Sequence, residues 1–353
     1  MESTRMRAET SMSFALPPGP GRAGASMTPA RSAPPPTAAE VMLSEQTMDC
    51  HLPPSAPPSR LAAAHPLWSD AGLRFDEKEH VYWWEGAQVP RSVTQLRDAF
   101  WLAPGFDADD AIHKNLARWE AAPHKKPELH ELIRKRRAEG ADDCAVAEAI
   151  KALWKAKGDA AASAGTLLHF ALQCGLEQWP APAPGPDPDE LAAARTWLAG
   201  FCGAHDLVPF RAELAVVCRA PDGAPLVAGQ IDLLLKKRDE ERYVIVDWKR
   251  KAATPKWGGG PLQLLGTEQP GRFDTAVEGG PFDGLVNHDF NKYAAQLNIY
   301  AHILERMYDM EIDQLVLVQL GPDVPTPGYH AAVCPRWRER TRALFDALRA
   351  QGA

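Results

Sequence analysis

Residues 226–249 decide the fold, and they read LVAGQIDLLLKKRDEERYVIVDWK. Two runs rich in Val, Ile and Leu flank a charged segment, and this pattern predicts two successive β-strands joined by a turn. Three ionisable residues stand within or at the end of the apolar runs: Asp232, Asp247 and Lys249. A carboxylate in a buried strand is costly unless it is paired or binds a metal. The stretch therefore predicts a hydrophobic sheet that carries a polar site.

Further strands and helices surround this stretch. A third apolar run precedes it at residues 211–218, and a fourth follows at residues 312–320, which predicts four strands in all. Helical periodicity marks residues 189–205, 291–308 and 336–350. The order helix, three strands, helix, strand, helix predicts an α/β domain with a central β-sheet flanked by helices.

The chain before this core has a different character. Residues 73–85 predict a β-hairpin, and apolar spacing over residues 107–137 predicts helices that prolines interrupt. Another helical face ends near Gly158, and we expect a separate helix over residues 159–178. Residues 67–158 are therefore predicted to form an N-terminal part built from a β-hairpin and helices.

Two segments are rich in proline or glycine. Residues 1–66 form a Pro/Ala/Ser-rich tail, which we expect to be disordered because it buries too little apolar area to offset its ordering entropy. Residues 159–353 are assigned to the core, which contains a Gly/Pro-rich insertion at residues 254–290. This insertion is either a flap over the polar site or a surface loop.

Composition excludes several classes of protein. The 353 residues carry a net charge of −7, which argues against a purely electrostatic nucleic-acid binder but not against a local basic groove. No apolar run is long enough to span a bilayer, so no membrane partner is expected. Six cysteines lie far apart without a CxxC pair, which indicates free thiols in a reducing compartment.

The compartment is not fixed by these features. The nucleus or the cytoplasm fits a reduced protein best. Arginines near the N-terminus give a faint resemblance to a mitochondrial transit peptide, whereas Glu2 and Glu9 argue against one. Mitochondrial targeting therefore stays open.

The polar residues of the predicted sheet suit phosphodiester hydrolysis. Side chains alternate along a strand, so Asp247 and Lys249 share one face, and on neighbouring strands Glu213 and Asp232 would converge with them. Two carboxylates with an imidazole or a backbone oxygen can hold Mg²⁺ or Mn²⁺. A nearby ammonium can stabilise the charge that develops on a phosphate. The alternative is a plain Asp–Lys ion pair at a strand end.

Two predicted helices supply further candidates. His169 lies one turn after Gly165, whose missing side chain leaves room beside the imidazole for an ion or a phosphate. The alternative is an ordinary half-buried histidine. Gln296 and Tyr300 are four residues apart and share a helix face, and the alternative there is the polar edge of an amphipathic helix.

Five short motifs follow one another in the chain: GTLLH at residues 165–169, Glu213, GQID at residues 229–232, DWK at residues 247–249 and QLNIY at residues 296–300. In this order and context they resemble the PD-(D/E)XK nuclease superfamily, in particular its RecB-like exonuclease branch. The likeness covers about residues 160–304. It implies a restriction-endonuclease-like core, a mixed β-sheet flanked by helices, with an N-terminal helical extension.

The resemblance also implies a role for each motif residue. Three would be metal ligands, together with the backbone oxygen of Trp248: His169, Asp232 and Asp247. Four would serve catalysis, the first as the catalytic lysine and the others by assisting the metal site or positioning the lysine or the DNA: Lys249, Glu213, Gln296 and Tyr300.

The chain departs from some relatives in this branch. One RecB-like group carries four cysteines that hold an iron–sulfur cluster. The matching positions lack cysteine here, so the expected cofactor is Mg²⁺ or Mn²⁺ and no iron–sulfur cluster. No GxxxxGK[ST] motif is present, so any helicase, replication or recombination partner would be a separate chain.

Basic residues indicate where DNA would lie. They cluster within residues 113–137 of the N-terminal part, next to Lys249, and at the start of the helix that carries Gln296. The candidates for phosphate contacts are Lys114, Arg118, Arg136, Arg250, Lys251 and Lys292. The alternative is a solvated charged face.

The expected function is that of a Mg²⁺-dependent DNA nuclease. An exonuclease or a single-strand or flap nuclease in DNA repair, recombination or replication fits the resemblance best. The first alternative is a catalytically silent nucleic-acid-binding module with the same fold. The second is an enzyme that acts on another phosphate ester.

Overall fold

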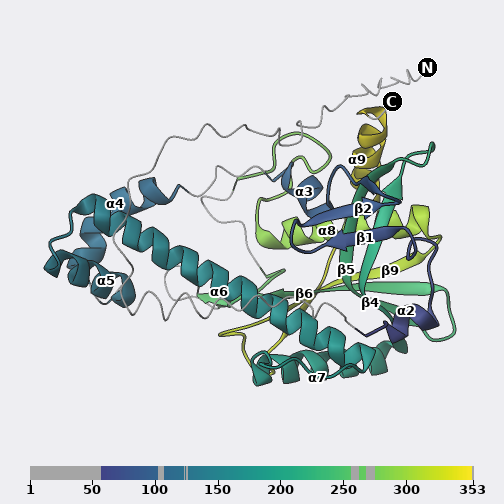
Figure 1. Cartoon of the computed structure of the whole chain (residues 1–353), viewed down its shortest axis with the longest axis horizontal. Coiled ribbons are helices and arrows are strands. Elements are labelled where there is room, and N and C mark those ends of the chain that lie inside the picture. Colours follow the sequence, from purple (N-terminus) through teal and green to yellow (C-terminus); the bar gives the residue numbers. More distant parts are fainter. Residues whose placement is uncertain are drawn as a thin grey trace, which may run out of the picture.

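The computed structural model describes residues 57–101, 107–122, 124, 126–255, 262–267 and 275–351. Most of the predicted tail and the middle of the predicted insertion lie outside these residues. The described chain forms a mixed α/β body from which a helical arm extends, as Figure 1 shows.

A five-stranded sheet lies at the centre of the body, in the order β10-β9-β6-β5-β4. Its strands are β4 (Leu207–Arg219), β5 (Pro225–Lys237), β6 (Arg242–Arg250), β9 (Glu311–Leu320) and β10 (His330–Val333). Strands β6 and β9 pair in parallel and the other neighbours pair antiparallel. The predicted mixed sheet and its four main strands are therefore confirmed, and β10 adds a short edge strand that the sequence pattern did not predict.

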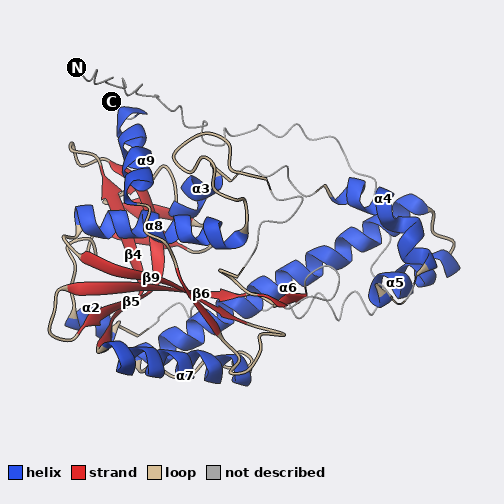
Figure 2. Cartoon of the chain, turned by 180° about the vertical axis from the view of Figure 1, so that it is seen from behind, coloured by secondary structure: helices blue, strands red, loops and turns tan. Residues whose placement is uncertain are grey.

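Helices cover both faces of this sheet, as Figure 2 shows. Helix α8 (Asp289–Met307) packs on one face, with α9 (Arg338–Gln351) on its outer side. Helix α7 (Pro188–His205) and the last turns of α6 (Asp143–Glu177) pack on the other. Strand alternation explains the two cores, because Tyr243 and Ile245 of β6 face α8 while Val244, Val246 and Trp248 face α6 and α7.

The predicted N-terminal hairpin is present and forms a small second sheet. Its strands are β1 (Leu73–Asp76), β2 (Val81–Trp84) and β3 (Ala87–Gln88). Buried Tyr82 and Trp84 pack with Val217 and Ala228 of the main sheet. Helix α3 (Val93–Asp98) follows, and Ser92 and Gln95 close its N-terminus in a reciprocal capping box.

Regular structure in the described chain begins before Leu67, the residue at which the folded part was expected to start. Helix α2 (Arg60–Ala64) is capped by the Ser59 hydroxyl and buries Leu61. The buried carboxylate of Glu177 accepts hydrogen bonds from Ser59 Oγ at 2.7 Å and from the Leu61 amide at 3.0 Å. The buried Leu61 side chain and the Glu177 carboxylate thus hold α2 in place, although the composition of this segment resembles that of the tail.

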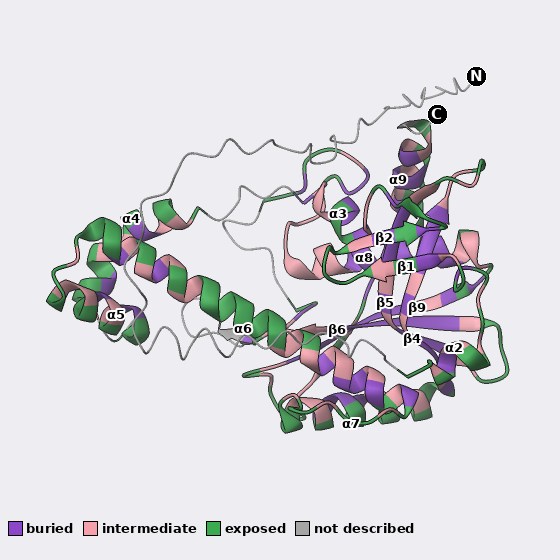
Figure 3. Cartoon of the chain, viewed as in Figure 1, coloured by how far each residue is buried: buried purple, intermediate pink, exposed green. Residues whose placement is uncertain are grey.

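Helix α6 is one continuous 35-residue helix, where the sequence pattern predicted two with a break near Gly158. Glycine costs an α-helix about 1 kcal/mol but leaves the hydrogen-bond ladder intact, unlike proline. The helix is about 50 Å long. Residues 155–163 are exposed on every side, and Figure 3 shows this bare middle between two partly buried ends.

The outer end of α6 carries the helical arm. Helices α4 (Ala108–Ala121) and α5 (Pro127–Ala138) pack there against the first turns of α6. The arm has a small core of its own, formed by Ile112, Trp119, Leu129, Ile133, Val146 and Ile150. The predicted N-terminal helical extension is confirmed, and it lies away from the central sheet (Figure 1).

Parts of the predicted insertion contribute to the body. Strands β7 (Thr254–Pro255) and β8 (Leu262–Gln263) form a two-stranded sheet, and Val277 and Phe282 are buried in the α8 core. The five cysteines of the described chain are free. No helix in the described ranges has the length and apolar character needed to cross a membrane.

Candidate metal centre

The site forms where strands β5 and β6 separate. Their ladder ends at the pair Leu233 and Val246, which leaves the backbone groups of Trp248 without a strand partner on that side. The Trp248 amide donates instead to Oδ2 of Asp232 at 2.8 Å. A buried amide needs an acceptor, so Asp232 both completes the backbone hydrogen bonding and is held in place by it.

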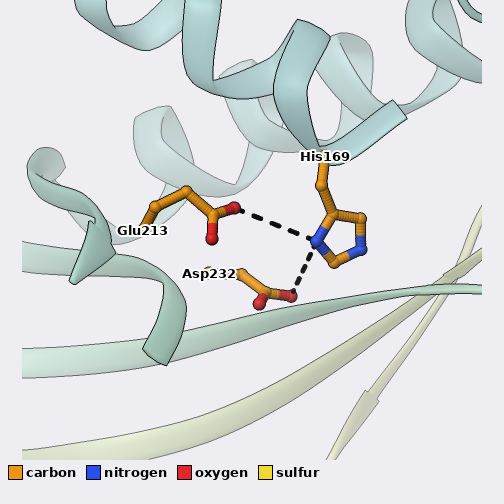
Figure 4. Close-up of side chains that lie close together, drawn as sticks. All are labelled: His169, Glu213 and Asp232. Carbon is orange, nitrogen blue, oxygen red and sulfur yellow. Dashed lines mark ion pairs between the residues drawn. The ribbon is translucent and has the colours of Figure 1, made fainter. Parts of the chain in front are cut away.

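The Trp248 carbonyl fixes the orientation of His169, which α6 brings to this point. His169 Nε2 lies 3.1 Å from that oxygen. Because a carbonyl can only accept, Nε2 carries a proton, and in the neutral imidazole Nδ1 then presents a lone pair. Nδ1 lies 3.6 Å from Asp232 Oδ2 and 3.9 Å from Glu213 Oε1, and Figure 4 shows both carboxylates turned toward it.

Glu213 reaches the site through an unusual backbone conformation. Its φ of +46° is left-handed, and among the positive-φ residues of the described chain it alone lies inside a strand. Its neighbours Ala212 and Leu214 pair with Leu233 and Ile231, so Glu213 stands opposite Asp232. Such a conformation costs about 1–3 kcal/mol and is typical of functional positions.

The electrostatics of the site favour a bound cation. Burial and the charges of Asp232 and Asp247 raise the pKa of Glu213 well above its ordinary value. Ligand atoms of His169, Glu213 and Asp232 lie within 4.8 Å of one another. An imidazole nitrogen held by a backbone hydrogen bond, beside two carboxylates, is a donor set that fits a divalent metal ion.

Asp247 and Lys249 form an ion pair next to this group, in which Asp247 is buried and Lys249 is half-buried. Oδ2 of Asp247 and Nζ of Lys249 are 2.5 Å apart. Burial raises the pKa of Asp247 to about 6, opposed by Lys249. Burial lowers the pKa of Lys249, but Asp247 and Asp232 outweigh it and the pKa is raised overall. Lys249 therefore stays an ammonium at neutral pH.

The residues that the structure groups as a candidate metal site differ from the ligands that the sequence predicted. Glu213, expected to assist the metal, is grouped with His169 and Asp232. Asp247, expected as a ligand, is paired with Lys249, because a carboxylate and an ammonium on one face of a buried strand attract strongly. The Trp248 oxygen, also expected as a ligand, orients His169.

Gln296 and Tyr300 lie behind the site on buried positions of α8. The side-chain oxygen of Gln296 accepts from Arg97 at 2.5 Å, and its amide lies 3.5 Å from the Tyr300 hydroxyl. The ring that contacts the catalytic-lysine candidate belongs to Tyr293, whose centroid is 4.9 Å from Lys249 Nζ. Tyr293 therefore contacts Lys249, and the positioning of the lysine or the DNA by Gln296 and Tyr300 stays a prediction.

Two residues near the site were not predicted from the sequence. Tyr82 of β2 is buried, and burial together with Glu213 and Asp232 raises its pKa. Arg97 of α3 is buried and links Gln296 to Asp98. Both residues come from the N-terminal part. The one sequence pattern that could have indicated either is the alternation of the hairpin strand, which turns Tyr82 inward together with Trp84.

Most of the predicted phosphate contacts have acidic neighbours in the described chain. Lys114 pairs with Asp110, Arg136 with Glu139, Lys251 with Asp289 and Lys292 with Asp98. Arg250 makes a two-pronged pair with Glu190 of α7 at 2.8 and 2.9 Å. Arg118 is exposed and, among the described residues, has no ion-pair partner. A continuous basic track along these residues is therefore not apparent.

Comparisons with known proteins add little. No protein-family model and no curated protein matches the chain. Twelve chains of solved structures match it. One is the crystal structure of SSO0001, at 13% sequence identity and a TM-score of 0.23, with 47% of this chain and 62% of that chain covered. The match spans less than two thirds of that chain, and a likeness this low carries no argument.

Proposed function

We propose that this protein is a divalent-metal-dependent nuclease that hydrolyses phosphodiester bonds in DNA. The observation that carries the proposal is the grouping of His169, Glu213 and Asp232 beside the ion pair of Asp247 and Lys249. Three carboxyl groups, one imidazole and one ammonium, gathered where β5 and β6 separate, suit a metal ion and a phosphate together.

The ligand group would hold Mg²⁺ or Mn²⁺ through Nδ1 of His169 and the carboxylates of Glu213 and Asp232. Such an ion, when bound, polarises a phosphate and lowers the pKa of a water. The protein's own contribution is to hold the ligands rigidly, because Asp232 and His169 are each tied to the backbone of Trp248.

Lys249 would stabilise the charge that develops on the phosphate oxygens during hydrolysis. Asp247 holds the ammonium at one side and the Tyr293 ring lies below it, so the charge is positioned before substrate binds. The contact with Asp247 engages one N–H of the ammonium, and an ammonium has three, so Lys249 can still donate a hydrogen bond to a phosphate oxygen.

The motif order supports the kind of reaction. The sequence resembles RecB-like members of the PD-(D/E)XK nucleases over the residues that form this site. We infer an exonuclease or a single-strand or flap nuclease that serves DNA repair, recombination or replication. Arg97 and Gln296 would support the site from behind, through the hydrogen bond between them.

A cleavage assay with matched lysine variants tests the proposal. Labelled single-stranded and double-stranded DNA, with 5′ or 3′ ends blocked, is incubated with the full chain and Mg²⁺ or Mn²⁺. We expect Lys249→Ala to lower the cleavage rate by about 100-fold or more. Lys237→Ala, at the far end of β5 and paired with Glu240, should retain a rate within about threefold of wild type.

Mn²⁺ calorimetry separates the roles of the residues. Asp232→Ala should weaken Mn²⁺ binding, whereas Lys249→Ala should bind Mn²⁺ at least as tightly as wild type, since it removes a positive charge. Asp239→Ala, in the exposed turn after β5, is the control. Cleavage that survives Lys249→Ala contradicts the assigned role, and DNA binding without cleavage in any metal supports the silent binding module instead.

A further inference from the structure

Three hollows lie side by side on the surface of the body. The first, about 630 Å³, is formed by the hairpin and includes Trp68 and Trp83. The second, about 580 Å³, lies between the β4–β5 turn and the ends of α8 and α9. The third, about 380 Å³, lies between α8 and α9 and is lined only by polar residues, among them His302 and Asn298.

Side-chain contacts and one shared residue join the hollows into one strip. The guanidinium of Arg219, in the second hollow, lies 4.3 Å from the ring centroid of Trp68 in the first. Trp68 also donates through Nε1 to the backbone oxygen of Met307, which lines the second hollow. Arg306 lines both the second and the third hollow.

The strip is strongly basic on a chain that is acidic overall. Seven arginines line it against three glutamates, a surplus of four, whereas the whole chain carries −7. The arginines are Arg74, Arg219, Arg306, Arg336, Arg338, Arg342 and Arg349. We call this surface, with Trp68 and Trp83, the arginine strip.

Several of these guanidinium groups are free to bind an anion. Glu305 pairs with Arg336 and Arg338. Arg74, Arg306 and Arg342 are exposed and have no ion-pair partner within the part of the chain that the structure describes. The planar donors of arginine fit phosphate oxygens two at a time, so the strip provides ready phosphate contacts.

The same strip exposes two large aromatic rings. Trp68 is 41% exposed and Trp83 is 38% exposed, whereas tryptophan is highly buried on average in folded proteins. Trp68 is held against Tyr308 by stacking at 5.0 Å. Trp83 lies directly across the hairpin from Arg74 and, among the described residues, contacts no other ring. Its face is available to a ligand.

We propose that the arginine strip binds single-stranded nucleic acid, with bases stacked on Trp83 and phosphates held by Arg306, Arg342 and their neighbours. Exposed aromatic rings at one end of a row of cationic groups match a polymer that has unpaired bases and a charged backbone. An acidic peptide would satisfy the arginines alone. A folded duplex would leave the tryptophan faces unused, because its bases are already stacked.

The strip lies at a distance from the metal centre. Tyr293, in contact with Lys249, and Arg306 are 13 residues apart on α8, which is about 20 Å along the helix. Its biological role rests on the proposed nuclease function, since the strip would hold the polymer whose other part reaches the metal centre. The binding itself requires no cleavage.

Fluorescence anisotropy with a labelled oligo-dT, in EDTA, tests the proposal on the full chain. We expect Trp83→Ala to weaken binding about tenfold. The double variant Arg306→Ala/Arg342→Ala should reduce the slope of log affinity against log salt by about 1.4, the value for two phosphate contacts on a single strand. Arg195→Ala/Arg238→Ala removes two arginines outside the strip and should leave both quantities unchanged.

Each other outcome has a definite meaning. Wild-type affinity and salt slope in Arg306→Ala/Arg342→Ala would overturn the proposal. A second pattern would also overturn it: polyglutamate of equal charge displaces the oligonucleotide, and Trp83→Ala binds the oligonucleotide as tightly as wild type. That pattern identifies an acidic protein partner. If the wild-type protein cleaves nothing in Mn²⁺ while the strip variants still lose binding, the nuclease proposal fails and the strip proposal stands.

Discussion

At the scale of single residues, the site depends on close contacts that leave no room for a methyl group. Gly229, in the GQID motif of β5, has the Tyr300 ring and Val93 directly above its Cα. A Cβ built there would lie 2.7 Å from Tyr300 Cε1 and 2.8 Å from Val93 Cγ2. Both neighbours are buried, so neither side chain can move aside without disturbing the core around it. The glycine allows α8 and α3 to approach the strand that carries Asp232.

We expect Gly229→Ala to lower the free energy of unfolding by about 1–3 kcal/mol, the usual cost of overpacking a core. Gly158→Ala is the matched control, since a Cβ there has nothing within 4 Å and lies on an exposed helical turn. That change should be neutral or stabilise by up to about 1 kcal/mol. Urea unfolding of the two variants checks this, and equal stability would mean that the Tyr300 contact is not tight.

The sequence predicted which residues form the site better than how they are arranged. Alternation and the cost of buried charge were enough to select Asp232, Asp247 and Lys249. The role of Glu213 depends on a left-handed backbone, and nothing in its local sequence requires positive φ. The orientation of His169 depends on a carbonyl 79 residues away in the chain, a long-range contact that no local pattern contains.

At the scale of elements, local sequence patterns indicate a helix boundary best where the side chains at that boundary form the cap themselves. The side chains of Ser92 and Gln95 close the start of α3 in a capping box, which is a local sequence pattern. Gly158 was a weaker signal, because glycine lowers helix stability without breaking hydrogen bonds, and α6 continues through it. Helix α2 was not predicted, since its stability comes from Glu177 rather than from its own five residues.

The contact between α8 and α9 contains a buried histidine that makes their packing sensitive to pH. The His302 ring stacks on Phe345 of α9 at 4.3 Å, and its Nε2 is buried without a hydrogen-bond partner in the described chain. Burial lowers the pKa of His302 to about 4, with Arg349 and Arg306 adding to the effect and Asp346 opposing it. Arg342 of α9 contributes in the same direction as the other arginines.

The sign of the pH effect follows from the lowered pKa. Between about pH 6.5 and pH 4 the unfolded chain binds a proton at this histidine and the folded chain does not. The free energy of unfolding is therefore highest above pH 6.5 and falls as the pH drops. We expect a loss of roughly 1–2 kcal/mol from this group between pH 7 and pH 5, after allowance for partial solvent screening.

Urea unfolding at pH 7 and pH 5 measures this loss. In His302→Gln the side chain no longer titrates, so the drop between the two pH values should be smaller than in wild type by that amount. His113→Gln changes an exposed histidine on the arm and should keep the wild-type drop. If His302→Gln also keeps it, other groups govern the acid sensitivity.

At the scale of the whole molecule, the described chain consists of a body and a helical arm, each with its own hydrophobic packing, joined by an exposed stretch of α6. The arm core lies around Trp119 and Ile133, and it shares no residue with the clusters that pack on the main sheet. Residues 155–163 between them are exposed on every side. An exposed stretch with few tertiary contacts opens at low cost, so the arm and the body should unfold as separate units.

A pair of proline variants tests this separation. Gly158→Pro breaks α6 where a Cβ would meet nothing within 4 Å and where the adjacent Lys157 pairs with Glu128 of the arm. The body should therefore unfold within about 1 kcal/mol of wild type, while a protease gains a new cutting site there. Gly165→Pro breaks the same helix one turn before His169, where α6 reaches β6, and should cost the body about 3 kcal/mol or more. Chemical unfolding with limited proteolysis gives both readouts. Equal destabilisation of the body by the two variants would show that arm and body form one cooperative unit, and α6 would then act as a rigid strut rather than a connector.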